Sequence, residues 1–470
     1  MPVPAFADSS EPALPLHVVR AEGLAGFLEG PGAAHAAWLR ASRFEAGPGE
    51  VRLLPAGDGT LAGAVAGLGT AEARGRGRFT LAAAAAALPG GVWRLAGDLS
   101  LAEREEAALG WLLAGYRHDR YRPGKAPSPE PARLVVPEGV DSPRLLAMAE
   151  GEFLTRRLVD TPAIDMGPDE IEAAFLALGA RFGAHCRVVR GDDLLAQGFP
   201  LIHAVGRASV RAPRLLELRR GDAGPRLTLV GKGVCFDTGG LDIKPASGMK
   251  LMKKDMGGAA TVMGLAQMVM ALDLPVRLRV LVPAVENAVA GNAMMPGDIV
   301  TSRKGLTVAI NNTDAEGRLI LADALAYAAE EETDALISMA TLTGAARVAV
   351  GPDLAPYWAE DDRMAAALEA GARAGFDPVW RMPFHAPYES MIEPGDADLD
   401  NAPEGGFAGA ITAALFLRRF AAHPRYMHFD IYAHTPVAAP ARPKGAVGQG
   451  ARAILCALPS LFGADRWTAV

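Results

Sequence analysis

The sequence holds little of what marks a secreted, membrane-embedded or nucleic-acid-binding protein. Its 3 cysteines are far apart and never form a Cys-x-x-Cys pair, which argues against a structural zinc knuckle and fits buried thiols in a reducing compartment. No apolar run approaches the roughly 18 residues of a membrane span, and the first ten residues lack a secretory signal. The net charge of −7 argues against nucleic acid or an anionic membrane as the main partner. We therefore expect a soluble, cytoplasmic protein.

The 470 residues are too many for one ordinary core and predict two domains. Five prolines among polar residues at 121–137 are typical of an exposed linker, and a helical pattern follows at 142–158. We expect an N-terminal α/β domain without a catalytic motif at 1–125, a linker and bridging helix at 126–160, and a catalytic domain at 161–470.

Strand and helix patterns alternate beyond residue 163, which predicts an α/β fold with a mostly parallel sheet and helices on both of its faces. In such sheets the ligand crevice lies at the carboxyl ends of the strands. The expected strands are 227–231, 276–282, 306–310 and 336–342, and the expected helices are 257–272, 319–329 and 363–374.

The octet at residues 312–319 reads Asn-Thr-Asp-Ala-Glu-Gly-Arg-Leu and lies between a predicted strand and a predicted helix. It places two carboxylates, Asp314 and Glu316, beside the guanidinium of Arg318. Such a cluster needs a metal or another positive partner. The alternative is a helix start with Asp314 as its N-cap and Glu316 favoured by the helix dipole.

A second polar cluster lies in the glycine-rich stretch 230–245, with Asp255 following just before a predicted helix. The spacing of its glycines matches neither a phosphate loop nor a dinucleotide fingerprint. The glycines allow close approach of the backbone, so that Lys232, Asp237 and Lys244 can point at one spot. For Asp255 an N-cap is again the alternative.

Four carboxylates from these two clusters cannot converge without cations. Two divalent ions about 3.5 to 4 Å apart, bridged by carboxylates and a water, would satisfy them and activate a nucleophile at neutral pH. The sequence lacks a His-Glu-x-x-His motif, so oxygen-dominated ligation favours manganese, magnesium or zinc in a carboxylate site.

Several motifs follow one another in a fixed order: residues 231–240, 244–245, 255–260, 312–319, 341–345, 380–383, 409–414 and 428–431. Together they resemble the leucyl (cytosol) aminopeptidase family, whose signature is the octet. The likeness runs from about residue 150 to the C-terminus. It implies a metal-dependent aminopeptidase that releases leucine and similar N-terminal residues from short peptides.

By this resemblance, one metal ion is held by Lys232, Asp237, Asp255 and Glu316, and the other by Asp237, Asp314 and Glu316. Lys232 would bind as the neutral amine, because two adjacent dications lower its pKa. The free α-amine of the substrate would bind one metal and its carbonyl oxygen the other, while a bridging water or hydroxide attacks that carbonyl.

The resemblance also implies roles for residues around the metals. Lys244 would stabilise the oxyanion, and Arg318 would hold a bicarbonate that shuttles the proton. Met252, Thr341 and Gly344 would shape a moderately apolar pocket for the first side chain. The family further implies a homohexamer that the N-terminal domain helps to assemble, with active sites facing an inner cavity that admits only short peptides.

Two stretches depart from the family pattern. Residues 432–434 read Tyr-Ala-His where the family more often has Ala-Gly-Thr, so the resemblance does not extend to the outer wall of the pocket. Ala451 replaces the valine of a Gly-x-Gly-Val-Arg run. Two other functions stay open: a non-catalytic or DNA-binding scaffold on the same fold, and a two-metal phosphatase, with which a ligand role for Lys232 is hard to reconcile.

Overall fold

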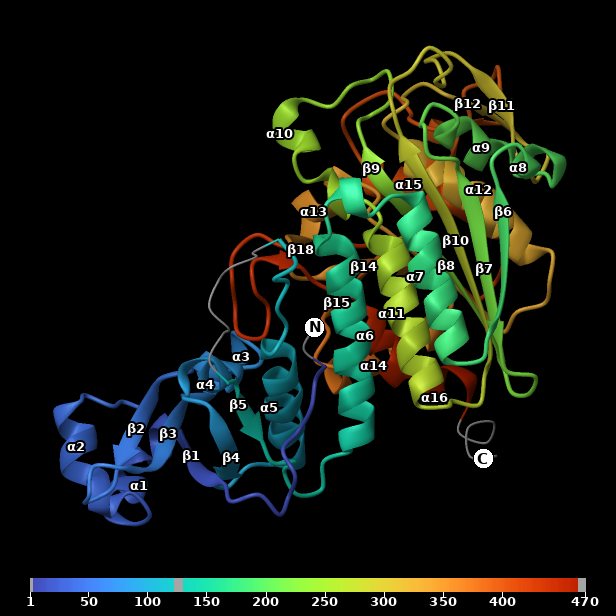
Figure 1. Ribbon diagram of the computed structural model, residues 1–470. Coiled ribbons are helices and arrows are strands. Elements are labelled where there is room, and N and C mark those ends of the chain that lie inside the picture. Colours follow the sequence, from blue (N-terminus) through green and yellow to red (C-terminus); the bar gives the residue numbers. More distant parts are fainter. Residues whose placement is uncertain (1–2, 122–129, 464–470) are drawn as a thin grey trace. The chain divides into compact units, whose positions relative to one another are not determined.

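The computed structural model describes residues 3–121 and 130–463, which form two compact units (Figure 1). The first unit comprises Met1–Phe153 with Val437–Lys444, and the second comprises Leu154–Pro436 with Gly445–Val470. Of the stretch predicted to be a linker, residues 122–129 lie outside the described residues. Its later part forms a strand, β5 (Ala132–Leu134), because the backbone of this segment pairs in parallel with a neighbouring strand.

The first unit is built on a five-stranded sheet with the order β2-β3-β1-β4-β5. The helix at Leu101–Ala114 begins with a capping box, in which Ser100 and Glu103 satisfy each other's backbone N–H groups. The elements are β1 (Leu14–Arg20), α1 (Leu24–Glu29), α2 (Ala36–Ala41), β2 (Val51–Pro55), β3 (Leu61–Gly69), α3 (Ala71–Gly75), α4 (Ala82–Ala87), β4 (Gly91–Ala96) and α5 (Leu101–Ala114).

The second unit contains a nine-stranded sheet with the order β15-β14-β17-β13-β8-β10-β7-β6, in which β9 also pairs with β10. The central strands β17, β13, β8 and β10 are parallel to one another, whereas β14 pairs antiparallel with β17 on one side and β7 pairs antiparallel with β10 and β6 on the other. The sheet is therefore mixed, and its parallel centre confirms the mostly parallel arrangement. The strands are β6 (His185–Arg190), β7 (Arg214–Arg220), β8 (Arg226–Gly231), β9 (Gly233–Asp237), β10 (Arg277–Asn287), β13 (Ala335–Ala340), β14 (Ala355–Ala359), β15 (Val379–Met382) and β17 (Tyr426–Asp430).

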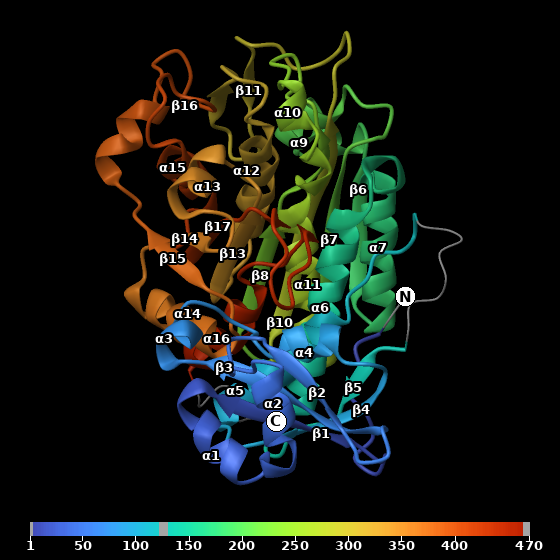
Figure 2. The same ribbon diagram turned by 90° about the vertical axis from the view of Figure 1, so that its left-hand side faces the viewer.

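Helices cover both faces of this sheet (Figures 1 and 2). On one face α11 is buried from Gly257 to Met270, and its small residues let it pack between the sheet and α16. On the other face α9, α12 and α15 enclose the largest apolar cluster. The helices are α6 (Ser142–Asp160), α7 (Pro168–Arg181), α8 (Asp193–Ala196), α9 (Pro200–Gly206), α10 (Ala246–Met249), α11 (Gly257–Ala271), α12 (Glu316–Ala329), α13 (Gly344–Val350), α14 (Asp362–Ala374), α15 (Gly409–Ala421) and α16 (Ala451–Phe462).

One predicted strand belongs to a different sheet. The segment expected at 306–310 forms β12 (Thr307–Ala309), which pairs with β11 (Ile299–Thr301) and β16 (Leu399–Asp400) in a separate three-stranded sheet. A tight turn, in which Ser302 N donates to Leu306 O at 2.8 Å, folds β11 back onto β12. Local pairing therefore takes this segment away from the main sheet, although α12 still follows it.

Two expectations from composition can be compared with the structure. None of the three cysteines forms a disulfide with a described residue, and only Cys235 is buried, since Cys186 and Cys456 are partly exposed. The expectation of three buried thiols is therefore wrong for two of them, because a strand and a helix each place one thiol near solvent. Within residues 3–121 and 130–463, no helix is long and apolar enough to cross a membrane.

Candidate metal centre

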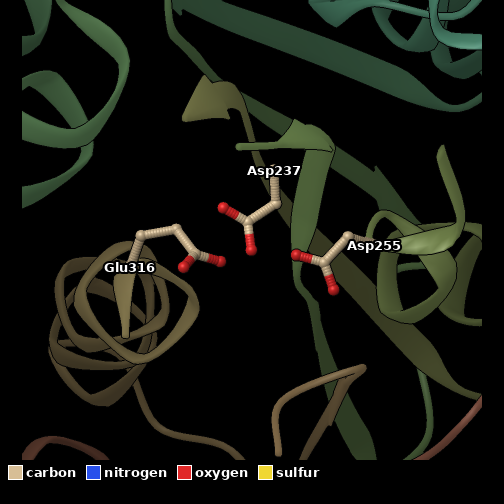
Figure 3. Close-up of side chains that lie close together, drawn as sticks. All are labelled: Asp237, Asp255 and Glu316. Atoms are coloured by element: carbon tan, nitrogen blue, oxygen red, sulfur yellow. The ribbon is translucent and has the colours of Figure 1, made fainter. Parts of the chain in front are cut away.

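Three carboxylates from distant parts of the sequence point toward one another in the second unit (Figure 3). Asp237, Asp255 and Glu316 each offer an oxygen, and these oxygens all lie within 4.8 Å of one another. Asp237 ends β9, Asp255 follows the 3-10 turn η4 (Met252–Lys254), and Glu316 is the first residue of α12. All three side chains are buried, with exposures of 2%, 3% and 1%.

Two lysines accompany these carboxylates. Lys232 Nζ lies 2.7 Å from Asp255 Oδ2 and 3.0 Å from Glu316 Oε1, and it donates to Thr341 O at 2.9 Å. The lysine is itself buried. It therefore lies inside the cluster, where it can act as a counter-charge or, once deprotonated, as a ligand.

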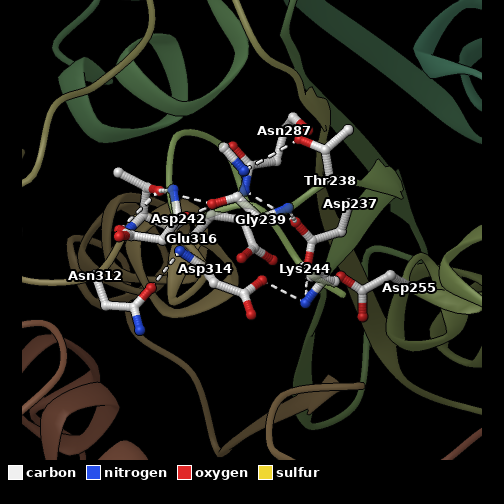
Figure 4. A network of polar contacts seen from close by, with 12 residues as sticks. Asp237, Thr238, Gly239, Asp242, Lys244, Asp255, Asn287, Asn312, Asp314 and Glu316 are labelled. Atoms are coloured by element: carbon white, nitrogen blue, oxygen red, sulfur yellow. Dashed lines mark hydrogen bonds and ion pairs between the residues drawn. The ribbon is translucent and has the colours of Figure 1, made fainter. Parts of the chain in front are cut away.

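Lys244 joins the fourth predicted carboxylate to the cluster (Figure 4). Its Nζ lies 2.8 Å from Asp237 Oδ2 and also forms an ion pair with Asp314. Four carboxylates against two ammonium groups leave two negative charges without a partner among these side chains. Buried charge of this kind requires further cations.

The carboxylate oxygens of the cluster have few protein partners, which shows where cations would fit. Glu316 Oε2 is buried and has no partner among the described residues, while Glu316 Oε1, Asp255 Oδ2 and Asp314 Oδ1 meet only the ammonium groups of Lys232 and Lys244. Buried acceptors in folded proteins nearly always have partners. These hard oxygen donors fit divalent metal ions, as the sequence predicted.

The structure does not support the alternative that Asp255 and Asp314 are simple helix caps. The N-cap of α11 is Met256 and that of α12 is Ala315, and neither contributes a side-chain hydrogen bond. Asp255 and Asp314 each stand one residue further back, with their carboxylates turned to the lysines. Their positions therefore serve the cluster and not the helix ends.

The pKa values of these side chains reflect the crowding of charge in the cluster. Burial and the charge of Asp237 raise the pKa of Glu316 well above its usual range and that of Asp314 to about 6. Burial alone would lower the pKa of Lys232, but the carboxylates of Asp255 and Glu316 outweigh it and raise that pKa. Divalent cations would oppose each of these shifts, since they favour carboxylates and the neutral amine.

The glycine-rich loop and the octet are tied together by hydrogen bonds. Gly239 has a φ of 91°, and a Cβ there would lie 2.4 Å from Asp242 O, so only glycine fits. This turn allows Asp242 Oδ2 to accept from Thr313 N at 2.7 Å, while Asp242 N donates to Thr313 Oγ1 at 2.9 Å. The link fixes Asp237 and Asp314 relative to each other.

Asn287 holds the cluster from a third side, and the sequence analysis missed it. Its Nδ2 donates to Asp237 Oδ1 at 2.9 Å and lies 3.1 Å from Thr313 O. Gly239 N donates to the same oxygen of Asp237 at 2.8 Å. Asn287 is the last residue of β10, and a polar residue at the carboxyl end of a buried strand was the signal that could have revealed it.

The glycine of the octet makes room for Lys232. A Cβ at Gly317 would lie 2.5 Å from Cε and 2.6 Å from Nζ of that lysine. Such distances are shorter than any real carbon contact, so a side chain at this position would displace Lys232. The octet thus supplies Glu316 as a candidate ligand and, one residue later, the space that its neighbouring lysine needs.

Arg318 differs from the other predicted site residues because its charge is unpaired. It is 8% exposed, and Nε and Nη1 have no acceptor among the described residues. Burial lowers its pKa to about 10, and the Phe416 ring centroid lies 6.0 Å from its Cζ. A buried guanidinium with free donors is suited to a small anion.

The predicted pocket residues lie on elements next to the cluster. Thr341 is part of it, since its Oγ1 lies 2.9 Å from Asp255 Oδ1 and 3.0 Å from Asp255 O. Met252 is half-buried on η4, two residues before Lys254. Gly344 is the exposed first residue of α13. The structure thus places Thr341 in contact with a candidate ligand and the other two on adjoining turns.

The fold and this cluster define a two-domain α/β protein with a buried carboxylate and lysine site that fits divalent metals. The profile of the cytosol aminopeptidase family, catalytic domain, matches residues 153–455, and that of the M17 aminopeptidase N-terminal domain matches residues 14–137. The chain belongs to the cytosol aminopeptidase family and is a hydrolase. Membership of this family implies metal-dependent aminopeptidase activity.

Individual relatives agree with this assignment. The chain is 38% identical to a probable cytosol aminopeptidase of Caulobacter vibrioides over 77% of this chain and 76% of the relative, and 41% identical to one of Geobacter sulfurreducens over 74% and 73%. The crystal structure of the cytosol aminopeptidase from Coxiella burnetii superposes with a TM-score of 0.91 at 39% identity, covering 97% of this chain and 99% of that one. The bottromycin maturation enzyme BotP in complex with Mn gives a TM-score of 0.86 at 33% identity, over 96% and 99%.

Proposed function

We propose that this protein releases leucine and similar N-terminal residues from short peptides, in a reaction that depends on two divalent metal ions. The observation that carries the proposal is the buried group of Asp237, Asp255 and Glu316, whose ligand oxygens lie within 4.8 Å of one another and partly lack hydrogen bonds. Membership of the cytosol aminopeptidase family supports it.

In this proposal one ion is held by Lys232, Asp237, Asp255 and Glu316, and the second by Asp237, Asp314 and Glu316. Manganese and zinc are the first candidates and magnesium is the third, because the donors are mostly carboxylate oxygens. When bound, the two ions would supply an activated water for attack on the scissile carbonyl and a site for the free α-amine. Lys232 must give up its proton to serve as a ligand.

Lys244 and Arg318 act as charged groups at the edge of this site. Lys244 is partly exposed while it contacts Asp237 and Asp314, so its ammonium can reach a substrate oxygen on which charge develops. Loss of such a donor costs about 10² to 10³ in rate. The unpaired Nε and Nη1 of Arg318 suit a bicarbonate that carries the proton between water and leaving group.

The pocket for the first side chain is formed by Met252, Thr341 and Gly344 in this proposal. We further propose a homohexamer that acts in peptide catabolism in the cytoplasm, in keeping with the name of its curated relatives. Light scattering on the purified protein tests the assembly. A mass of one or two chains at micromolar concentration would contradict it.

Hydrolysis of leucine p-nitroanilide and of its N-acetylated analogue tests the activity directly. The protein is stripped of metal and assayed before and after addition of manganese or zinc. We expect cleavage of the free-amine substrate alone, restored by metal. Cleavage of both substrates would contradict binding of the α-amine by metal, and cleavage of neither by the metal-loaded protein would contradict the activity.

A further inference from the structure

Two cations lie against one aromatic ring in the stretch where the sequence departs from its family. Lys254 Nζ is 4.9 Å and Arg347 Cζ is 5.1 Å from the centroid of the Tyr432 ring. We call Lys254, Arg347 and Tyr432 the cation–tyrosine cluster. A ring face attracts cations and holds them in place without neutralising their charge.

Both cations of this cluster lack a carboxylate partner. Among the described residues, neither Lys254 nor Arg347 forms an ion pair or a hydrogen bond through its side chain. Lys254 is only 6% exposed, and lysines are almost never this deeply buried unless they are paired. An unpaired ammonium inside a protein is costly, which suggests that its partner is a bound molecule.

Two carboxylates whose charges act on Lys254 have other direct partners. Asp255 Oδ2 lies 2.7 Å from Lys232 Nζ. Asp430 accepts hydrogen bonds from Leu342 N at 2.8 Å and from Thr343 Oγ1 at 2.6 Å. The cations of the cation–tyrosine cluster therefore have no direct counter-ion among the described residues.

The cluster also borders each residue of the proposed pocket. Lys254 shares the turn η4 with Met252. A Cβ at Gly257 would lie 2.5 Å from Ala433 Cβ and 3.0 Å from Thr341 Cγ2, so the segment after Tyr432 packs beside Thr341. A Cβ at Gly344 would lie 4.0 Å from Arg347 Nη2. Gly344 and Arg347 are exposed, which leaves this side open to an incoming peptide.

From this arrangement we propose that Lys254 and Arg347, positioned by Tyr432, bind the carboxylate of an acidic first side chain. Peptides that begin with glutamate or aspartate are then preferred over those that begin with an uncharged side chain of the same shape. The proposal rests on the aminopeptidase function and names its substrate class. It gives a cationic character to the outer wall of the pocket, to which the family resemblance does not extend.

Glutamyl and glutaminyl p-nitroanilides test this preference, because their side chains differ in charge but hardly in shape. With the manganese-loaded protein, kcat/KM for the glutamyl substrate should exceed that for the glutaminyl substrate by about tenfold or more. Equal values, or a preference for glutamine, would overturn the proposal. If neither these substrates nor leucine p-nitroanilide were cleaved, the proposed function itself would be wrong.

Substitutions test whether the cation–tyrosine cluster causes the preference for an acidic first side chain. In Lys254→Met and in Arg347→Met the ratio of the two kcat/KM values should fall toward one, whereas Arg363→Met, which removes an exposed positive charge on α14, should keep the wild-type ratio. An unchanged ratio in both cluster variants would overturn the assignment. Because the readout is a ratio, a partly folded preparation does not change it.

A carboxylate could also come from the far end of a short substrate. Leucyl-glycine and leucyl-glycinamide separate the two sources, since only the first has a C-terminal carboxylate. Because neither substrate has an acidic first side chain, we expect Lys254→Met to leave the ratio of their kcat/KM values unchanged. A selective loss for leucyl-glycine would place the carboxylate at the C-terminus of a dipeptide and overturn the assignment to the first side chain.

Discussion

Helix α12 carries two buried acids whose surroundings differ completely. Glu316, at its first position, meets only the ammonium of Lys232, 3.0 Å from its Oε1, and its Oε2 has no partner among the described residues. Asp323, further along the same helix, accepts from Leu201 N at 2.7 Å, from Ile202 N at 3.3 Å and from Arg303 N at 2.9 Å. Burial raises the pKa of both. Burial alone therefore does not mark a functional acid; a buried oxygen left without a partner does.

The largest expected effect comes from removing the charge of Glu316. Glu316→Gln should lower kcat/KM by about 10³-fold or more, because metal-ion catalysis is worth several kcal/mol and this residue would touch both ions. The metal-free variant should unfold at the same denaturant concentration as wild type, or at a higher one. Metal content measured on the purified variant should fall below two ions per chain, and wild-type content would contradict the ligand role.

The opposite outcome is expected for the acid with three donors. Asp323→Ala leaves three buried N–H groups without an acceptor, and each such loss costs about 1 to 3 kcal/mol. We expect the free energy of unfolding to drop by about 3 kcal/mol or more on that basis, with kcat/KM per folded molecule close to wild type. Equilibrium denaturation alongside the leucine p-nitroanilide assay measures both, and a selective loss of activity would contradict a structural role.

Asp237 is the intermediate case, because two uncharged donors hold its Oδ1 while its Oδ2 meets only the ammonium of Lys244. Asn287→Ala removes the donor at 2.9 Å and leaves Gly239 N on the same oxygen. Loss of a group that orients a metal ligand typically costs about 10 to 100-fold in affinity or activity. Titration of the metal-free variant with manganese should show weaker binding, and unchanged affinity would show that the loop alone positions Asp237.

A further expected effect is a pH dependence of stability that belongs to Asp323. Burial raises its pKa from 3.8 to about 7, so the folded state holds a proton that the unfolded state has lost within this window. Stability must then fall as pH rises from about 4 to about 7. Relative to Asp323→Asn, which cannot ionise, the wild type should lose stability over this range, and a constant difference between the two would contradict the raised pKa.

Local sequence patterns predicted most of the fold and the convergence of Asp237, Asp255 and Glu316, because each motif lies at the end of a strand or the start of a helix. The sheet to which each strand belongs could not be predicted in the same way. The segment that became β12 has the composition of a core strand, but the partner it pairs with depends on a turn and on β16, which lies about 90 residues later.

Side-chain contacts between different helices and strands could not be predicted from the sequence either. Asn287 is one polar residue at the end of a long strand, and only the register of β10 beside β9 brings it to Asp237. In the sequence, Lys253 and Lys254 are two neighbouring lysines with nothing to distinguish them. In the structure, Lys253 Nζ donates to Asp160 O at 2.6 Å, whereas Lys254 is buried against Tyr432. Such differences arise from tertiary packing.

The buried helix α11 has a consequence for heat tolerance. Asp255 lies two residues before α11, whose residues from Gly257 to Met270 are all buried, so its carboxylate cannot shift unless the helix moves. The helix can move only if the packing of the surrounding core is disrupted. On heating, the geometry of the candidate centre should therefore persist until the second unit melts, and inactivation should follow the same transition as the loss of helical circular dichroism.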